Sequence, residues 1–303
     1  MERPQDRDEG NQGQRQPRNT MPSDLIKAGL RSRLLAHLRE VVRERDPYRA
    51  PEGHSYVKNY LRRELARWGK VDLHTFEHLG TTHENLVLNL AGQQDQGLIL
   101  IGAHYDTVPG SPGADDNGTA IAVLLEVARV FSITPARRPV RLVAFDLEER
   151  HQSGSRAYAE HLRKKGEPLA LMIALEMLGY RNSLPGSQRY PRGLNYLYPN
   201  RGDFIGLIGN LRTIPTLRRL ARAMRKDVPC EYLPVPLKGH IVPDTRRSDH
   251  APFWDLGYPA IMITDTANMR NPHYHLASDR IDTLDIEFLE GVCRGVISGV
   301  SSL

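Results

Sequence analysis

Cysteine, aromatic residues and long apolar runs are all scarce in this chain of 303 residues. Its two cysteines, Cys230 and Cys293, are too few for a disulfide-stabilised scaffold or for a zinc site built from cysteine alone. A transmembrane helix needs about 20 apolar residues. The best apolar run, residues 169–178, is half that length and contains Glu176. The sequence therefore predicts no membrane-spanning helix.

The first residues also lack the features of a targeting segment. Residues 1–20 are rich in Arg, Gln, Asp and Asn and contain no apolar core, so they do not resemble a secretory signal. Residues 1–22 are polar and show no hydrophobic period, which predicts a flexible tail. This absence of a signal favours a cytoplasmic location.

Charge of one sign is not concentrated anywhere along the chain. The 41 Lys and Arg residues exceed the 36 Asp and Glu residues by five, but the two signs are interleaved, as in residues 43–46. Interleaved charge is typical of a solvated surface, and no nucleic-acid-binding motif is present. The composition, 40% hydrophobic and 25% charged, is that of a globular protein with no nucleic-acid partner.

Short apolar runs alternate with helical patterns beyond residue 80. We expect strands at 85–90, 98–103, 140–145, 169–175, 204–208 and 260–264. We expect helices that start at Ser23 and at residues 53, 120, 155, 217 and 285. This alternation predicts one α/β domain over residues 23–303, with a largely parallel central sheet and helices on both faces. Residues 181–203 are expected to form a long functional loop.

Acids and histidines follow four of the expected strands. They are His104 and Asp106, Glu148 and Glu149, Glu176, and finally Asp265 and His275, with Asp116 in a Gly-bounded segment between the first two strands. Ligands of open α/β sheets bind beyond the carboxyl ends of the strands. Acids gathered at one edge repel each other unless a cation neutralises them. Histidine and carboxylate ligands without cysteine suit a catalytic divalent metal, zinc above all.

The spacing also suggests separate tasks for these residues. Asp106 can accept the proton of the second ring nitrogen of His104 and so fix its tautomer. Glu148 and Glu149 point to different sides of an extended segment. One can bind metal while the other takes a proton from water, which is the arrangement for metal-assisted hydrolysis.

Six ordered motifs together resemble the co-catalytic di-zinc aminopeptidase family, whose relatives include glutamate carboxypeptidase II, the transferrin receptor and the glutaminyl cyclases. The motifs are His104-Tyr-Asp106-Thr-Val-Pro, Gly113-Ala-Asp-Asp116-Asn-Gly, Glu148-Glu149, Leu175-Glu176-Met, Ser248-Asp249-His250 and Asn271-Pro-His-Tyr-His275. The resemblance spans about residues 80–285. It implies a zinc-dependent exopeptidase acting on peptides with a free N-terminus.

The resemblance also implies a role for each site residue. Two Zn²⁺ ions would share Asp116, one also held by Glu149 and His275 and the other by His104 and Glu176. Glu148 would be the general base and Asp106 would orient His104. The family further implies a cis peptide bond after Asp116, a pocket-side position for Asp249 and His250, and a structural role for His273. One of three loop tyrosines, Tyr190, Tyr196 or Tyr198, is a candidate oxyanion donor, although packing is the commoner role of such a residue.

Two departures from the family pattern and several alternatives stay open. Many members have Asp in place of Glu176, and residues 150–152 differ from the usual Gly-Leu. A related zinc carboxypeptidase or deacylase family has a longer gap between its first His and its bridging Asp than the 12 positions found here. A single-zinc glutaminyl cyclase and a non-catalytic binding homologue are the remaining hypotheses. No His-Glu-x-x-His or Gly-x-Ser-x-Gly motif is present.

Overall fold

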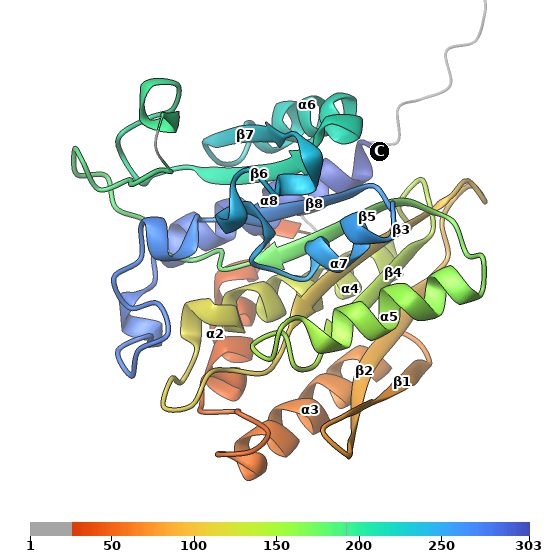
Figure 1. Cartoon of the computed structure of the whole chain (residues 1–303). Coiled ribbons are helices and arrows are strands. Elements are labelled where there is room, and N and C mark those ends of the chain that lie inside the picture. The colour runs from red at the N-terminus through yellow and green to blue at the C-terminus, as the bar shows by residue number, and fades with distance from the viewer. Residues whose placement is uncertain (1–25, 192) are drawn as a thin grey trace, which may run out of the picture.

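A computed structural model describes residues 26–191 and 193–303, so the expected tail at residues 1–22 lies outside the described residues. A mixed eight-stranded sheet in the order β1-β2-β4-β3-β5-β8-β6-β7 forms the centre of the described chain (Figure 1). The strands are Val71–His78 (β1), Thr81–Leu90 (β2), Leu98–His104 (β3), Val140–Phe145 (β4), Leu169–Glu176 (β5), Ile205–Asn210 (β6), Cys230–Val235 (β7) and Ala260–Thr264 (β8).

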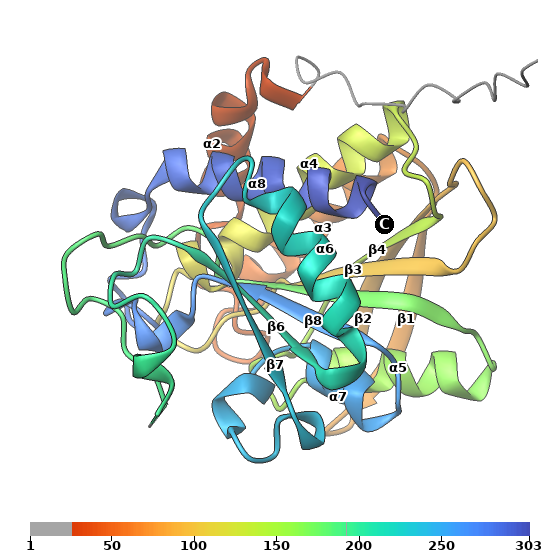
Figure 2. The ribbon, with the colours of Figure 1, turned by 90° about the horizontal axis from the view of Figure 1, so that it is seen from above.

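Helices cover both faces of this sheet (Figure 2). One face carries α2 (Leu30–Val41), α3 (Pro51–Ala66), α4 (Ala120–Ile133), α6 (Ile214–Met224) and α8 (Ile286–Ser301), and the other carries α5 (Ser153–Lys164) and α7 (His250–Asp255). The expected three-layer α/β domain is confirmed. Within the described ranges, every helix is too short or too polar to span a bilayer.

Local sequence explains the larger helix layer. Helix α4 is apolar and buried almost all round because it lies against the sheet and also contacts α2 and α8. Helix α8 begins where the Asp285 carboxylate accepts a hydrogen bond from the Phe288 amide at 2.9 Å. A Cβ atom at Gly299 would lie 3.1 Å from Leu220, so this glycine allows α8 to approach α6 closely.

The expected strands all form, and the sequence analysis missed two more. Strand β1 is an edge strand whose polar residues are half exposed, and β7, the opposite edge strand, contains Pro234. Proline is tolerated at an edge, but it obscures the strand pattern in the sequence. The short helix α7 also escaped prediction. The elements β1, β7 and α7 do not change the direction of the central strands.

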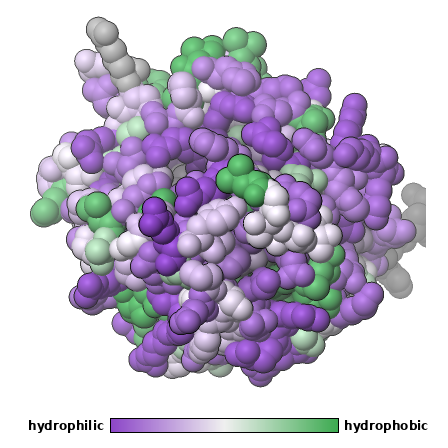
Figure 3. Space-filling model, turned by 60° about the horizontal axis from the view of Figure 1, so that its bottom comes forward, coloured by the Kyte–Doolittle hydropathy of each residue, from purple (hydrophilic) through white to green (hydrophobic). Residues whose placement is uncertain are grey.

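The direction of the central strands positions the candidate site. Strands β4, β3, β5 and β8 are neighbours and run parallel, while β2 and β6 join them antiparallel on either side. Four carboxyl ends therefore meet at one edge of the sheet. Beyond β5, the described residues 177–191 and 193–204 include the expected loop, with a short 3₁₀ turn at Leu194–Tyr196. The face in Figure 3 is largely hydrophilic, with apolar residues in small separate groups, as interleaved charge predicts.

Candidate metal centre

The carboxylate of Asp106 organises the first part of the site. His104 ends β3, and its Nδ1 lies 3.4 Å from Asp106 Oδ1. The same carboxylate accepts hydrogen bonds from the backbone amides of Glu148 at 3.0 Å and Glu149 at 3.1 Å. Asp106 and His104 are both fully buried. One side chain therefore orients the histidine and fixes the turn that carries both glutamates.

Asp116 lies at the middle of the cluster. Its peptide bond to Asn117 is cis, as expected. The Asp279 carboxylate accepts hydrogen bonds from the amides of Asp115 at 2.9 Å and Asp116 at 3.0 Å, which holds this turn in place. Asp116 Oδ1 lies 3.2 Å from His104 Nε2, and Oδ2 lies 3.2 Å from His275 Nε2. Its two oxygens thus face two different histidines.

Each of these histidines also faces a second carboxylate. Glu176 Oε2, at the end of β5, lies 3.6 Å from His104 Nε2, and Glu149 Oε2 lies 3.3 Å from His275 Nε2. The hydroxyl of Ser248 donates a 2.7 Å hydrogen bond to Glu176 Oε2 and fixes that carboxylate. The cluster therefore consists of two overlapping halves that share Asp116.

The polar atoms of this cluster are arranged for metal binding rather than for hydrogen bonds among themselves. His104 Nε2, His275 Nε2 and Asp116 Oδ1 are buried and have no hydrogen-bond partner. Buried polar atoms are normally paired, so unpaired atoms on both sides of the Asp116 carboxylate suggest bound cations. Ligand atoms within 4.8 Å of one another occur in His104–Asp116–Glu176 and in Asp116–Glu149–His275. Imidazole and carboxylate donors without thiolates suit zinc in a catalytic site.

Electrostatics also indicate an uncompensated cluster of acids. Burial, with the neighbouring Asp116, raises the pKa of Glu149 to about 7. Burial also raises the pKa of Glu148 well above its usual range, and Glu149 and Glu176 add to this effect although His104 opposes it. Divalent cations would relieve this repulsion, because they favour the ionised carboxylates.

A buried arginine, Arg45, lies close enough to the acidic cluster to interact with its charges. The Arg45 side chain is fully buried, and its guanidinium donates to the carbonyl oxygens of Tyr105 at 2.7 Å, Pro112 at 2.7 Å and Gly113 at 2.9 Å. Burial lowers its pKa to about 10, so it stays protonated at neutral pH. The sequence analysis missed this residue, because the alternating charges at residues 43–46 indicated a solvated face.

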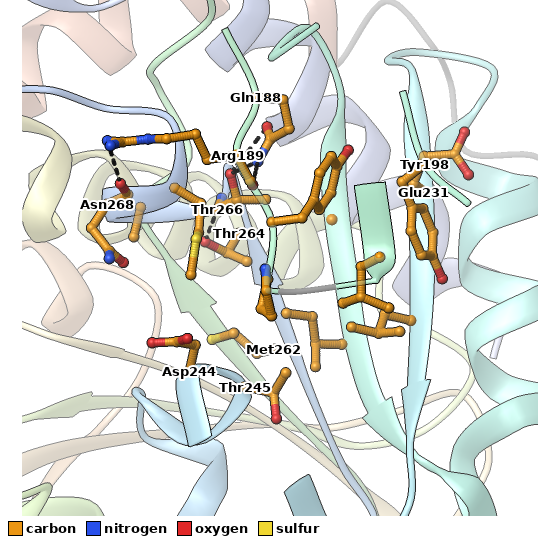
Figure 4. Close-up of a pocket in the computed structure, with 18 of the residues that line it drawn as sticks. Gln188, Arg189, Tyr198, Glu231, Asp244, Thr245, Met262, Thr264, Thr266 and Asn268 are labelled. Carbon is orange, nitrogen blue, oxygen red and sulfur yellow. Dashed lines mark hydrogen bonds between the residues drawn. The ribbon is translucent and has the colours of Figure 1, made fainter. Parts of the chain in front are cut away.

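A pocket of about 850 Å³, open mouth included, begins at Glu176 and extends away from the cluster. Met262 and Thr264 of β8 lie along it, and Tyr198 and Glu231 lie at its far side (Figure 4). Much of its remaining lining is apolar or aromatic, including Tyr190, Leu194, Phe204, Leu207, Ile208, Tyr232, Leu233 and Met269, although Arg189, Asp244 and Arg247 also line it. This pocket suits an apolar group attached to a substrate bound at the cluster.

Comparisons with known proteins assign the chain to a family. The sequence pattern of peptidase family M28 matches residues 85–299, more than half of the chain. The chain belongs to peptidase family M28. YfbL of Escherichia coli (strain K12) is 40% identical over 230 residues, which cover 72% of this chain and 71% of YfbL. As an M28 member, the chain is a metal-dependent peptidase, and the family implies zinc.

Other relatives of this M28 peptidase have aminopeptidase names. Aminopeptidase YwaD of Bacillus subtilis (strain 168) is 38% identical over 103 residues, which cover 31% of this chain and 23% of YwaD. The solved LapA aminopeptidase of Legionella pneumophila shares the fold, with a TM-score of 0.70 at 18% identity, over 94% of this chain and 76% of LapA. So does a Macrostomum lignano glutaminyl cyclase, with a TM-score of 0.71 at 16% identity, over 94% and 92% of the two chains.

The structure of this M28 peptidase brings together all seven residues expected at the metal centre. His273 lies outside the cluster, where its Nδ1 is 3.0 Å from Ser278 Oγ, as a structural role requires. Asp249 and His250 are buried directly after Ser248. The sequence motif contains Ser248 but does not indicate its hydrogen bond to Glu176.

The expectation about the loop tyrosines is wrong. Tyr190 donates its hydroxyl to the Pro199 carbonyl at 2.5 Å, and Tyr198 donates to the Tyr232 carbonyl at 2.9 Å. Tyr196 is 86% exposed. None of these three hydroxyls contacts the metal cluster in the described structure. The tyrosine that does adjoin it is Tyr274, whose ring stacks on His275 with the ring centres 3.7 Å apart.

Proposed function

We propose that this chain is a two-zinc aminopeptidase that hydrolyses the first peptide bond of peptides with a free N-terminus. The observation that carries the proposal is the position of Asp116 between His104 and His275. One ion would be held by Asp116, His104 and Glu176, and the other by Asp116, Glu149 and His275. When bound, the ions supply Lewis-acid activation of water and of the scissile carbonyl.

Glu148 acts as the general base in this proposal. Its carboxylate accepts a proton from the attacking water and delivers it to the nitrogen of the leaving peptide. Burial raises the pKa of Glu148, which brings it toward the range that suits both steps. Gln152 Nε2 donates to Glu148 Oε1 at 3.2 Å and restricts its side chain. Asp106 keeps His104 in the tautomer that presents Nε2 to the cluster.

Selection for the N-terminus follows from charge and shape. A free amine is a cation at neutral pH, and the acids of the cluster attract it, whereas an internal peptide bond offers no such group. The adjoining apolar pocket would take the side chain of the N-terminal residue. A large apolar N-terminal residue is therefore the expected substrate feature.

The test combines zinc content with hydrolysis of a panel of aminoacyl-anilides. The wild type, Glu148→Gln and the exposed control Glu287→Gln would be compared. We expect near two zinc ions per chain in all three, and a loss of kcat of about 10²- to 10⁴-fold only in Glu148→Gln. Equal activity of Glu148→Gln and wild type would refute the role of Glu148.

The same experiment separates the alternatives. One zinc per chain with cyclisation of N-terminal glutamine would replace the proposal by a glutaminyl cyclase. Cleavage only of C-terminal residues or N-acyl groups would indicate the carboxypeptidase or deacylase alternative. Zinc-free protein without turnover would indicate a binding homologue. A cytoplasmic location stays a prediction, which cell fractionation tests.

A further inference from the structure

One cation lies at the junction between the metal cluster and the apolar pocket. Arg247 lines the pocket together with Glu176 and Tyr274. Its Nη2 donates to the Tyr274 hydroxyl at 2.9 Å, and its Nη1 lies 3.4 Å from Asn268 Oδ1 and 3.7 Å from Asp244 Oδ1. The Arg247 side chain is 45% exposed. The guanidinium is thus held in position but remains accessible.

Arg247 is connected to both halves of the cluster. The next residue in the chain, Ser248, donates to Glu176 at 2.7 Å. The Tyr274 ring, which Arg247 contacts, stacks on His275. Through Tyr274 and through its chain neighbour Ser248, Arg247 is thus linked to one ligand of each half.

The contacts of Arg247 leave hydrogen-bonding capacity unused. A guanidinium has five N–H donors in a planar fork that matches a carboxylate. The bond to Tyr274 is short, whereas the approaches to Asn268 and Asp244 are long. Asp244 is itself 44% exposed, so it is a weak competitor for the fork. An incoming carboxylate can therefore form a bidentate pair here.

The distribution of charge around the site also favours a substrate carboxylate at Arg247. The negative charge of the cluster acids that the zinc ions do not neutralise would attract the substrate amine but repel a nearby carboxylate. Arg247 offsets this repulsion at one side of the cluster. The whole site thus presents an acidic part and a cationic part, as a small zwitterion would require. Two extended residues span about 7 Å, so a carboxylate within two residues of the amine stays close to the scissile bond.

On the basis of the proposed aminopeptidase function, we propose that Arg247 binds a substrate carboxylate that lies within two residues of the N-terminus. The carboxylate belongs either to the C-terminus of a dipeptide or to an acidic N-terminal side chain. Both sources have the same chemistry, and either makes Arg247 a residue that determines specificity. The enzyme would then act on a dipeptide better than on the amide of the same dipeptide, or on a peptide that begins with Glu better than on one that begins with Gln.

The test compares kcat/KM for Leu-Gly, Leu-Gly-amide, Glu-anilide and Leu-anilide in zinc-loaded wild type, Arg247→Gln and Arg247→Lys. Arg67→Gln is a matched control, because Arg67 also pairs with an acid three residues earlier, Glu64, and lies far from the cluster in α3–β1. We expect Arg247→Gln to lower kcat/KM about 10- to 100-fold for the carboxylate substrate, as lost charge-assisted hydrogen bonds do. For the matching uncharged substrate, kcat/KM of Arg247→Gln should change less than about 3-fold. For the carboxylate substrate, kcat/KM of Arg247→Lys should lie between those of the wild type and Arg247→Gln.

The pattern of losses identifies the source of the carboxylate. A loss confined to Leu-Gly indicates the C-terminal carboxylate, and a loss confined to Glu-anilide indicates the side chain. If Arg247→Gln lowered kcat/KM equally for all four substrates, or for none of them, the proposal would be overturned. A selective loss in Arg189→Gln but not in Arg247→Gln would also overturn it, since Arg189 also lines the pocket.

A binding measurement keeps this inference separate from the proposed function. In the Glu148→Gln background, calorimetry would compare the affinity for Leu-Gly and Leu-Gly-amide, with and without Arg247→Gln. We expect Arg247→Gln to remove the preference for Leu-Gly or, with glutamate amide against glutamine amide, the preference for the acidic side chain. Unchanged preferences would overturn the role of Arg247. A wild type that binds these ligands without hydrolysing the anilides or peptides would instead overturn the aminopeptidase function.

Discussion

The metal cluster and the pocket wall are built from different kinds of structure. The cluster lies at the carboxyl ends of the central strands, and its members His104 and Asp106 are fully buried. The pocket wall combines side chains of β6, β7 and β8 with loop residues of 188–191, 194, 198 and 244–247, and part of this loop side is exposed, as the 45% exposure of the Arg247 side chain shows. The metal centre therefore lies at buried strand ends and the turns that follow them, whereas the pocket wall adds exposed loop residues, which commonly determine substrate choice.

This difference implies different sensitivities to mutation. A change in the cluster removes a buried charge from a network of hydrogen bonds, so it affects metal binding, stability and activity together. A change in the wall removes one contact with substrate and leaves the network intact. The following predictions test that separation, starting with the change expected to have the largest effect.

Asp116→Asn should have the largest effect on activity. Asp116 faces both histidines, so its loss weakens both metal positions at once. We expect less than one zinc per chain and a loss of kcat/KM of at least about 10³-fold, since metal ions supply several kcal/mol of transition-state stabilisation. Zinc analysis and anilide assays measure both effects. Two tightly bound zinc ions in Asp116→Asn would contradict the shared position of this carboxylate.

Arg45→Met should have the largest effect on stability. It would leave the buried carbonyls of Val41, Tyr105 and Gly113 without this donor. Each unsatisfied buried group costs about 1–3 kcal/mol, so we expect the free energy of unfolding to fall by at least about 3 kcal/mol. Arg45→Lys keeps the charge with fewer donors and should lose less. Urea unfolding of the metal-free variants measures this, and equal losses in both variants would show that the retained charge adds no stability and that the guanidinium hydrogen bonds carry the effect.

The metal-free protein should lose stability as pH rises. The pKa of Glu149 is about 7 in the folded protein against a reference of 4.5, so between these values the folded state keeps a proton that the unfolded chain has lost. For His275, burial lowers the pKa, but Asp116 and Glu149 raise it to about 10 from 6.5. The protonated His275 therefore stabilises the folded state fully below pH 6.5, and this stabilisation is lost as the pH rises toward 10.

Both shifts act in the same direction, and each proton contributes up to about 1.4 kcal/mol per pH unit within its window. The thermal midpoint of chelator-treated protein should therefore fall from pH 5 to pH 8. The zinc-loaded protein should not show this fall, because metal replaces the protons and binds more tightly as the ligands deprotonate. Identical profiles with and without zinc would show that these groups do not form the metal site.

The separation between cluster and wall also explains what the sequence could predict. His104, Glu148 and Glu176 directly follow strands that have clear apolar patterns, so the strand order alone brings them to one edge. Arg45 was missed because burial of a charged residue depends on distant segments, here the loop at residues 105–116. The loop tyrosines were misassigned because the local sequence does not indicate which backbone carbonyl accepts the hydrogen bond of a tyrosine hydroxyl.

The smallest effect is expected from Tyr198→Phe in the pocket wall. The hydroxyl of Tyr198 donates to the Tyr232 carbonyl of β7 at 2.9 Å, and the ring stacks near Tyr190. Its loss removes one half-buried hydrogen bond, about 1 kcal/mol, and loosens the far side of the pocket. We expect KM for bulky aminoacyl-anilides to rise less than about 5-fold, with kcat and zinc content unchanged. Tyr196→Phe, at an exposed position, is the control. A fall in kcat of Tyr198→Phe comparable to that of Glu148→Gln would mean that this hydroxyl reaches the reacting carbonyl after all, and that wall and cluster are not separate.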